Sequence, residues 1–245
     1  MAGQKLIPTR FHEIRRWLKD RGIARQLQRP EGRARYWNEL VAQCANRSLV
    51  GLLESTLSLP GDVIECGVFR GASLQQMACA LKESGSQKRI YGLDSFEGFP
   101  EGSVQPCDVG TGRWFSALQK KFRFCADTPA HLRGICNAFD LNVELIPGYF
   151  CDTLSRVKDR TFCFIHIDVD LYQSYKECLE ALYDRLVPGG VIVFDEWKSG
   201  EWPGATQAIN EFLSNHPEEV QQCTDRKQFA DYIRKQSAVA ARAVA

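Results

Sequence analysis

Two acidic pairs in the sequence have the residue types and the spacing of a metal site. Asp168 and Asp170 follow the apolar run "FCFIHI", and Asp195 and Glu196 follow the apolar run "VIVF". If these runs form neighbouring parallel strands, all four acids lie at the same edge of the sheet and converge there. Carboxylates that close raise one another's pKa unless a cation lies among them. A hard divalent cation with oxygen ligands resolves this conflict most simply, and Mg²⁺ fits best.

The first acidic pair can divide two tasks between its members. Alternation along an extended strand points Asp168 and Asp170 to the same side, so that one can bind the metal while the other faces a substrate. A hydroxyl held by the metal would have a lowered pKa, and Asp170 is placed to accept its proton as a general base. His166 belongs to the same run and either supports this site or is simply packed. The alternative for the acids is that two of them cap the helices that follow.

The segment "GDVIECGVFRGAS" (61–73) has the composition of a nucleotide site with an unusual glycine pattern. It contains Glu65, Gly67 and Gly71, but it lacks the three-glycine turn of dinucleotide sites and the lysine of a P-loop. A ligand without phosphates needs only close backbone approach at Gly67 and an acid, Glu65, near an ammonium or sulfonium group. Asp94 ends the next apolar run, where a carboxylate can accept both ribose hydroxyls. These features favour S-adenosylmethionine, and the alternative for Asp94 is a turn or cap aspartate.

Strand and helix patterns alternate along the chain and predict the fold that must hold these residues. We expect an α/β fold with a doubly wound, mostly parallel sheet and helices on both faces. The expected strands span residues 63–66, 89–94, 143–146, 161–168 and 191–195, and the expected helices begin near residues 73, 127, 174 and 204. Ser73 with Gln76, and Ser174 with Glu177, have the spacing of a capping box. The segment 219–235 fits a helix or a closing pair of strands equally well.

The first fifty residues differ from the rest in charge. They hold eleven Lys or Arg residues against four Asp or Glu residues, together with Trp17 and Trp37. We expect residues 1–50 to form a helical extension and residues 51–245 to form the main domain. This basic N-terminal region, which carries both tryptophans, and the segment 198–204 after the second acidic pair are expected to cover the acceptor pocket as lids. The alternative for residues 1–50 is a solvated basic face.

Composition argues against several partners. The formal net charge is +1 at pH 7 with 25% charged residues, so no global basic field favours nucleic acid. No run reaches the ~20 apolar residues that cross a bilayer, and the N-terminus lacks the apolar core of a signal peptide. The ten cysteines are irregularly spaced and form no CxxC pair, so we expect reduced thiols in a cytoplasmic protein. A homodimer is one assembly that the sequence allows.

Several segments together resemble the macrocin O-methyltransferase (TylF-type) family, class I methyltransferases that use S-adenosylmethionine and a divalent metal on a Rossmann-like fold. The matching segments are "ECGVFRGAS" (65–73), "GLDSFEGFP" (92–100), "IPGYFCDTL" (146–154), "HIDVDLYQS" (166–174), "LYDRLVPGGVIVFDEW" (182–197) and "ATQAINEF" (205–212). They cover most of residues 60–215 in order. The segments "DSFEG" and "GYF-x-DTL" are specific, because the physics of the fold alone does not require them.

The resemblance assigns roles within the matching segments. It implies metal ligation by Asp168, Asp195 and Glu196, and it suggests Asp170 as the catalytic base. It also places the contacts to S-adenosylmethionine at Glu65, Gly67, Ser73, Asp94, Ser95, Phe150 and Asp168. The chain departs from the family where members commonly read D-G-D for Asp168-Val169-Asp170. It departs again where they often read Asp-Asp-Tyr for Asp195-Glu196-Trp197.

We therefore predict an O-methyltransferase that depends on S-adenosylmethionine and a divalent metal and acts on a hydroxyl of a small molecule. A secondary metabolite or its sugar is the expected acceptor, although the segments before residue 60 and after 215 match the family poorly and leave its identity open. The alternatives are methyl transfer to nitrogen or carbon, a nicotinamide-dependent oxidoreductase on the same fold class, and a cofactor-binding protein without turnover.

Overall fold

The computed structural model describes residues 22–45, 47–109, 128–224 and 230–236. Its strands are β1 (Asp62–Cys66), β2 (Ile90–Asp94), β3 (Val143–Pro147), β4 (Phe162–Ile167), β5 (Leu186–Phe194), β6 (Gln221–Cys223) and β7 (Ala230–Arg234). Its α-helices include α2 (Pro30–Cys44), α3 (Ser48–Glu54), α4 (Ala72–Glu83), α6 (Thr128–Ala138), α7 (Phe150–Thr153), α8 (Tyr172–Leu182) and α9 (Pro203–Leu213). Short 3₁₀ helices are η1 (Pro106–Asp108), η2 (Leu154–Val157) and η3 (Tyr183–Arg185).

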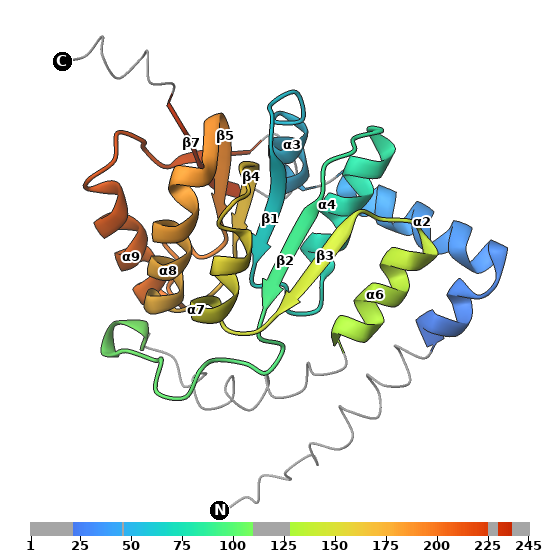
Figure 1. Ribbon diagram of the computed structural model, residues 1–245, viewed down its shortest axis with the longest axis horizontal. Helices are drawn as coiled ribbons and strands as arrows, with labels where there is room; N and C mark the ends of the chain where they lie inside the picture. Colours follow the sequence, from blue (N-terminus) through green and yellow to red (C-terminus); the bar gives the residue numbers. More distant parts are fainter. Residues whose placement is uncertain (1–21, 46, 110–127, 225–229, 237–245) are drawn as a thin grey trace, which may run out of the picture.

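The strands form one sheet in the order β3-β2-β1-β4-β5-β7-β6 (Figure 1). β1 to β5 run parallel to one another, while β7 is antiparallel to both β5 and β6. The reversal of strand order at β1 and β4 places a topological switch point there, where ligands bind in open α/β sheets. The predicted doubly wound, mostly parallel sheet is confirmed.

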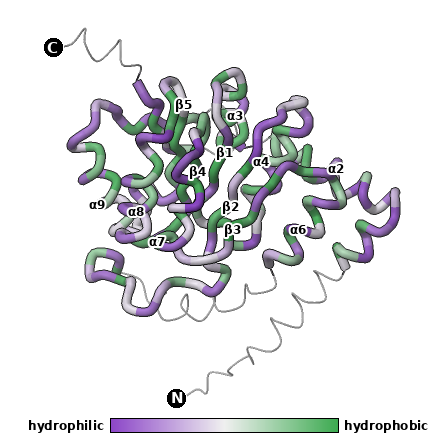
Figure 2. Tube along the Cα trace, in the orientation of Figure 1, coloured by the Kyte–Doolittle hydropathy of each residue, from purple (hydrophilic) through white to green (hydrophobic). Residues whose placement is uncertain are grey.

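The sheet is buried on both faces by two layers of helices. α2, α3, α4 and α6 contribute to the core on one face, and η2, α8 and α9 contribute to the core on the other. All six residues of β4 are buried, as expected of a central strand in a parallel sheet. Figure 2 shows the same distribution, with hydrophobic segments gathered along the central strands. No helix within the described ranges has the length and apolar character to span a bilayer.

Two expected boundaries change at the C-terminal side of the sheet. β5 begins at Leu186 rather than at 191, because Gly189 and Gly190 still exchange backbone hydrogen bonds with Lys235, at 2.9 Å each. The ambiguous segment 219–235 supplies the antiparallel strands β6 and β7 rather than a helix. The remaining predicted strands agree with the structure to within two residues at each end.

The predicted capping box of Ser73 with Gln76 is wrong. α4 begins one residue earlier, at Ala72, and its N-cap residue is Gly71, which has a φ of 75° and offers no side chain. The Gln76 side chain instead accepts a hydrogen bond from Arg47 at 3.0 Å, which ties α4 to the chain just before α3. The Gln76 side chain, which the local pattern assigned to the cap of α4, therefore binds a residue from another part of the chain.

The predicted capping box of Ser174 with Glu177 is also wrong. α8 begins at Tyr172, after the N-cap residue Leu171, and no side chain caps it locally. Glu177 accepts from Gln173 at 3.1 Å, a contact along the helix surface. The backbone N–H of Tyr172, the first residue of α8, instead donates to a carboxylate that lies far away in the sequence.

The carboxyl ends of β1 and β4 approach each other closely at Gly67. The N–H of Asp168 donates to the carbonyl of Cys66 at 2.9 Å, and Gly67 then turns the chain with a φ of 88°. A Cβ atom at position 67 would lie 1.6 Å from the carbonyl oxygen of Asp168. Glycine is therefore required here by the packing of two strands, and not only by approach of a ligand.

Replacing Gly67 with alanine is expected to lower the free energy of unfolding by at least about 3 kcal/mol, because a backbone clash and a left-handed φ are imposed together. Gly134→Ala is the matched control, since this helical glycine is exposed and has no heavy atom near its Cβ position. We expect the control to raise stability by about 0.5–1 kcal/mol. Urea denaturation checks both, and wild-type stability in Gly67→Ala would contradict the close approach.

Candidate functional site

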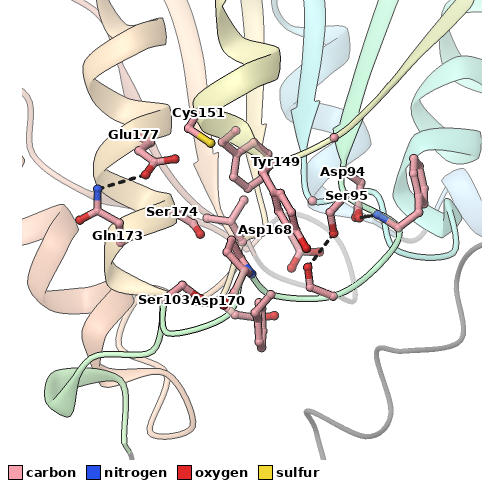
Figure 3. Close-up of a pocket in the computed structure, with 18 of the residues that line it drawn as sticks. Asp94, Ser95, Ser103, Tyr149, Cys151, Asp168, Asp170, Gln173, Ser174 and Glu177 are labelled. Carbon is pink, nitrogen blue, oxygen red and sulfur yellow. Dashed lines mark hydrogen bonds between the residues drawn. The ribbon is translucent and has the colours of Figure 1, made fainter.

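A cavity of about 400 Å³ lies at the carboxyl ends of β1, β2, β3 and β4 (Figure 3). Its walls are the β1–α4 turn, the loop after β2, the loop that leads into α7, and the turn that leads into α8. The predicted site residues that line it are Gly67, Asp94, Ser95, Phe150, Asp168 and Asp170. Its volume lies within the ~300–1,000 Å³ that is usual for small-molecule sites.

Two residues predicted to contact the cofactor do not line this cavity. Glu65 has no exposed surface, and its Oε1 accepts a hydrogen bond from Nδ1 of His166 at 2.9 Å. Register explains the pair, because Glu65 on β1 lies opposite His166 on β4. Ser73 is buried in the first turn of α4. Contact of the cofactor with Glu65 or Ser73 stays a prediction.

The buried pair of Glu65 and His166 carries charge into the base of the site. Burial lowers the pKa of His166, but the hydrogen bond to Glu65 and the charges of Glu65, Asp168 and Asp195 outweigh it and leave that pKa above its ordinary value. The pair is an ion pair when His166 is protonated, which this shift favours. The second oxygen of Glu65, Oε2, is buried without a hydrogen-bond partner among the described residues. His166 thus supports the acids rather than serving only as packing.

Asp94 lines the cavity and also organises its floor. Oδ2 accepts the N–H groups of Val68 and Phe69 at 2.8 and 2.7 Å, and Oδ1 accepts that of Phe96 at 2.6 Å. Burial raises the pKa of Asp94, although these three bonds oppose the shift. A carboxylate has roughly four acceptor positions, so about one remains. These bonds show the turn aspartate that was the alternative reading. Asp94 also lines the cavity, and its contact with ribose hydroxyls stays a prediction.

The four predicted acids converge, and Asp168 is the residue that they share. Ligand atoms of Asp168, Asp170 and Glu196 all lie within 4.8 Å of one another. Ligand atoms of His166, Asp168 and Asp195 do the same. The predicted convergence is confirmed, but the structure distributes the expected ligands around Asp168 in two overlapping groups, with Asp195 beside His166 and Glu196 beside Asp170.

Asp170 reaches this cluster by a route that strand alternation does not give. β4 ends at Ile167, so the chain is no longer extended at Asp170, which adopts a left-handed φ of 62°. The same tight turn brings the N–H of Leu171 to 2.6 Å from the carbonyl of Val169. Asp168 and Asp170 therefore face the same space, as predicted, but the predicted cause, alternation along an extended strand, is wrong. A left-handed conformation is uncommon outside glycine and is often found at functional sites.

Glu196 is held from the side of α8. Its side chain is buried and accepts a hydrogen bond from the hydroxyl of Tyr175, which is also buried. Burial and the nearby charges of Asp168 and Asp170 raise the pKa of Glu196 well above its ordinary range. Tyr175 could not be predicted as part of the site, because only the packing of α8 over the sheet brings it to the second acidic pair.

The electrostatics of the cluster test whether a divalent cation fits. Burial and the charge of Asp195 raise the pKa of Asp168 to about 6, even though His166 opposes the shift. Burial and the charge of Asp168 raise that of Asp170 well above its ordinary range. Carboxylates are thus destabilised in their charged forms while their oxygens lie close together. A donor set dominated by carboxylate oxygens, beside one imidazole, fits a hard divalent cation.

The segments predicted as lids have different surroundings. The indole N–H of Trp37 donates to Glu83 at 2.9 Å and its ring packs on Phe139, so Trp37 lies against α4 and does not line the cavity. Trp17 lies outside the described residues. In the segment 198–204, Trp202 is buried and its ring meets Phe99 of the cavity wall edge to face, at 6.0 Å between centroids. Of the two predicted lids, the segment 198–204 therefore contacts the cavity wall, and the described part of the N-terminal region shows no such contact through Trp37.

Comparison with known proteins connects this geometry to one group of enzymes. Residues 50–232 match the model of the family described as macrocin-O-methyltransferase (TylF). Over 149 residues the chain is 32% identical to the 8-demethyl-8-(2,3-dimethoxy-alpha-L-rhamnosyl)-tetracenomycin-C 4'-O-methyltransferase of Streptomyces olivaceus. The matched region covers 57% of this chain and 54% of that protein. The chain spans between 54% and 65% of the length of three curated relatives that it matches.

Solved structures show the same fold. The O-methyltransferase NovP has a TM-score of 0.63 and 25% sequence identity, over 78% of each chain. The calicheamicin methyltransferase CalS11 has a TM-score of 0.65 over 96% of this chain and 98% of its own, and at 24% identity the likeness concerns the fold alone. The described sheet and helices therefore have the same arrangement as these two solved structures.

The ionic pair under the site makes a testable contribution to stability. Glu65→Gln or His166→Gln alone is expected to lower the free energy of unfolding by about 3 kcal/mol, because each leaves a buried charge without its partner. The double variant should lose at least about 1 kcal/mol less than the sum. Arg89→Ala serves as the control, since its ion pair with Glu144 is exposed and should contribute less than about 1 kcal/mol. Additive losses in a double-mutant cycle would show that the two side chains are not coupled.

Proposed function

The chain belongs to the macrocin O-methyltransferase family, and from this premise we propose that it transfers a methyl group from S-adenosylmethionine to a small-molecule hydroxyl with the help of a divalent cation. The observation that carries the proposal is the convergence of four acids on Asp168 at the wall of the cavity. A cavity for the donor and a cluster for a cation are thus adjacent, and Asp168 and Asp170 belong to both.

The cavity supports S-adenosylmethionine as the donor. Bound there, the cofactor would supply an electrophilic methyl group on a sulfonium centre. Asp94 fixes the turn after Gly67 through its bonds to Val68 and Phe69, and it keeps acceptor capacity for a ribose hydroxyl. Aromatic side chains, among them Phe96 and Phe150, add apolar wall, which would limit the water around a bound cofactor.

The acidic cluster supports a divalent cation as the second requirement. We propose that Asp168, Asp195 and Glu196 hold it, with Glu196 fixed by Tyr175. Mg²⁺ or a similar cation held there would lower the pKa of the acceptor hydroxyl and fix its position. His166 stabilises the ionised form of Asp168, as its effect on the pKa of that residue indicates.

Asp170 is the proposed general base. It lines the cavity and lies within reach of Asp168 and Glu196, so a hydroxyl held at the cluster meets its carboxylate. Its raised pKa makes that carboxylate a better proton acceptor than an exposed aspartate, once it is ionised. The left-handed turn at Asp170 fixes the side chain toward the cluster rather than along the strand.

The name of one relative supports an acceptor class. That name specifies a rhamnosyl group and the 4'-O position, so we propose a sugar hydroxyl on a secondary metabolite. Nitrogen or carbon acceptors need no cation to react, and they are the outcome if the cluster has no catalytic role. A nicotinamide-dependent oxidoreductase is not favoured, because this chain belongs to a methyltransferase family.

Formation of S-adenosylhomocysteine from a panel of rhamnosylated metabolites tests the proposal. Excess chelator should abolish turnover and added Mg²⁺ should restore it. Asp168→Asn should lose both calorimetric Mg²⁺ binding and turnover. Asp170→Asn should keep Mg²⁺ binding while turnover falls by roughly 10²–10⁴, the usual contribution of a general base.

Asp159→Asn is the matched control, because this exposed aspartate precedes β4 at the opposite edge of the sheet. It should retain both metal binding and turnover. Full turnover in excess chelator would contradict metal dependence and would favour a nitrogen or carbon acceptor.

A further inference from the structure

Residues 95–109 form a strap that closes one side of the cavity. The strap leaves the end of β2 and runs beneath the sheet to α8 and α9, as the green segment of Figure 1 shows. It contributes Ser95, Phe96, Gly98, Phe99, Pro100 and Ser103 to the cavity wall. The position of this part of the cavity wall therefore depends on how the two ends of the strap are attached to the rest of the protein.

The far end of the strap is attached through Asp108, a residue with no exposed surface. Oδ1 of Asp108 accepts the N–H of Tyr172, the first residue of α8, at 2.7 Å. Oδ2 accepts the N–H of Gln105 at 2.8 Å, which closes the short helix η1 on itself. One buried carboxylate thus fixes the local shape of the strap and joins it to a distant helix, and bonds from N–H groups to a charged acceptor are strong.

The same carboxylate lies against the first turn of α9. A Cβ atom at Gly204, the second residue of α9, would lie 2.0 Å from Oδ1 of Asp108. Glycine at 204 is what allows the approach, and the N-terminal ends of two helices favour a negative charge there. A second attachment lies close by, because Trp202, the residue before α9, contacts Phe99 of the strap.

These contacts join the cavity wall to the helices that follow the acids. α8 begins directly after the turn that holds Asp170, and α9 begins a few residues after Glu196. A displaced Asp108 would break the hydrogen bond of the strap to α8 and its contact with Gly204 of α9, while the sheet and the acidic cluster would keep their own contacts. Loss of this attachment should therefore affect the cofactor cavity more than the cation site.

We propose that Asp108 is a positioning residue for cofactor binding. It holds the strap as a preformed wall of the S-adenosylmethionine cavity, so that binding does not have to order fifteen residues of loop. The proposal rests on the proposed function, because the cofactor it names is that of the methyl transfer. Asp108 touches neither the cavity nor the cluster and acts only through the strap.

Calorimetric binding of S-adenosylhomocysteine to the full chain, with and without Mg²⁺, tests this role. Asp108→Ala and Gly204→Ala should each weaken binding about tenfold, which corresponds to a strap in position about one tenth of the time. Asp108→Asn keeps one acceptor oxygen and should lie between wild type and Asp108→Ala. Glu101→Gln is the matched control, since this acid belongs to the strap but is exposed, and it should bind as wild type does.

Hydrogen exchange distinguishes positioning from a general effect on stability. In Asp108→Ala and Gly204→Ala, backbone hydrogen exchange should accelerate in residues 95–109 and remain unchanged in α4. Both variants should keep the Mg²⁺ affinity of the wild-type chain. Affinity for S-adenosylhomocysteine within about twofold of wild type in folded Gly204→Ala and Asp108→Asn would overturn the inference, even if Asp108→Ala does not fold. Uniformly faster exchange would also overturn it. Failure of the wild-type chain to bind S-adenosylhomocysteine would instead overturn the proposed function itself.

Discussion

Repulsion among carboxylates at the ends of β4 and β5 is the constraint on which the rest of the site depends. Parallel pairing of these strands brings the two acidic pairs together, and burial then raises the pKa of Asp168 to about 6. Two neighbouring side chains compensate part of this charge. The imidazole of His166 lowers the pKa of Asp168, and the hydroxyl of Tyr175 on α8 donates a hydrogen bond to Glu196. A divalent cation would complete the compensation, and the acids that would hold it lie at the wall of the cavity.

The features that could be predicted from the sequence depend on periodicity and on strand ends. Buried parallel strands are almost continuous apolar runs, so β4 and the second half of β5 were recognisable, and their neighbouring positions follow from the doubly wound fold. Residues directly after such runs lie at the switch-point edge whatever the details of the turn. For this reason Asp94, Asp168 and Asp195 could be assigned to one edge without knowledge of any contact.

The features that could not be predicted depend on register and on contacts between distant segments. Glu65 meets His166 only because β1 and β4 pair in one particular register, and the same strand pattern is compatible with others. Asp108 caps α8 from 64 residues away, so a search for a local capping box at that helix finds the wrong residues. The left-handed turn at Asp170 has no signal in its own sequence, since neither valine nor aspartate before a leucine requires it.

Proton release on cation binding is the most direct test of the central claim. Carboxylates with raised pKa values are partly protonated near neutral pH, and they must lose those protons to ligate a metal. Titration of the protein with Mg²⁺ by calorimetry at pH 7, in buffers that differ in ionisation enthalpy, measures this release. We predict net release of protons for the wild-type chain and none for Asp168→Asn, which should not bind the cation. A binding enthalpy that does not depend on the buffer would contradict the claim that these acids are held together against their own repulsion.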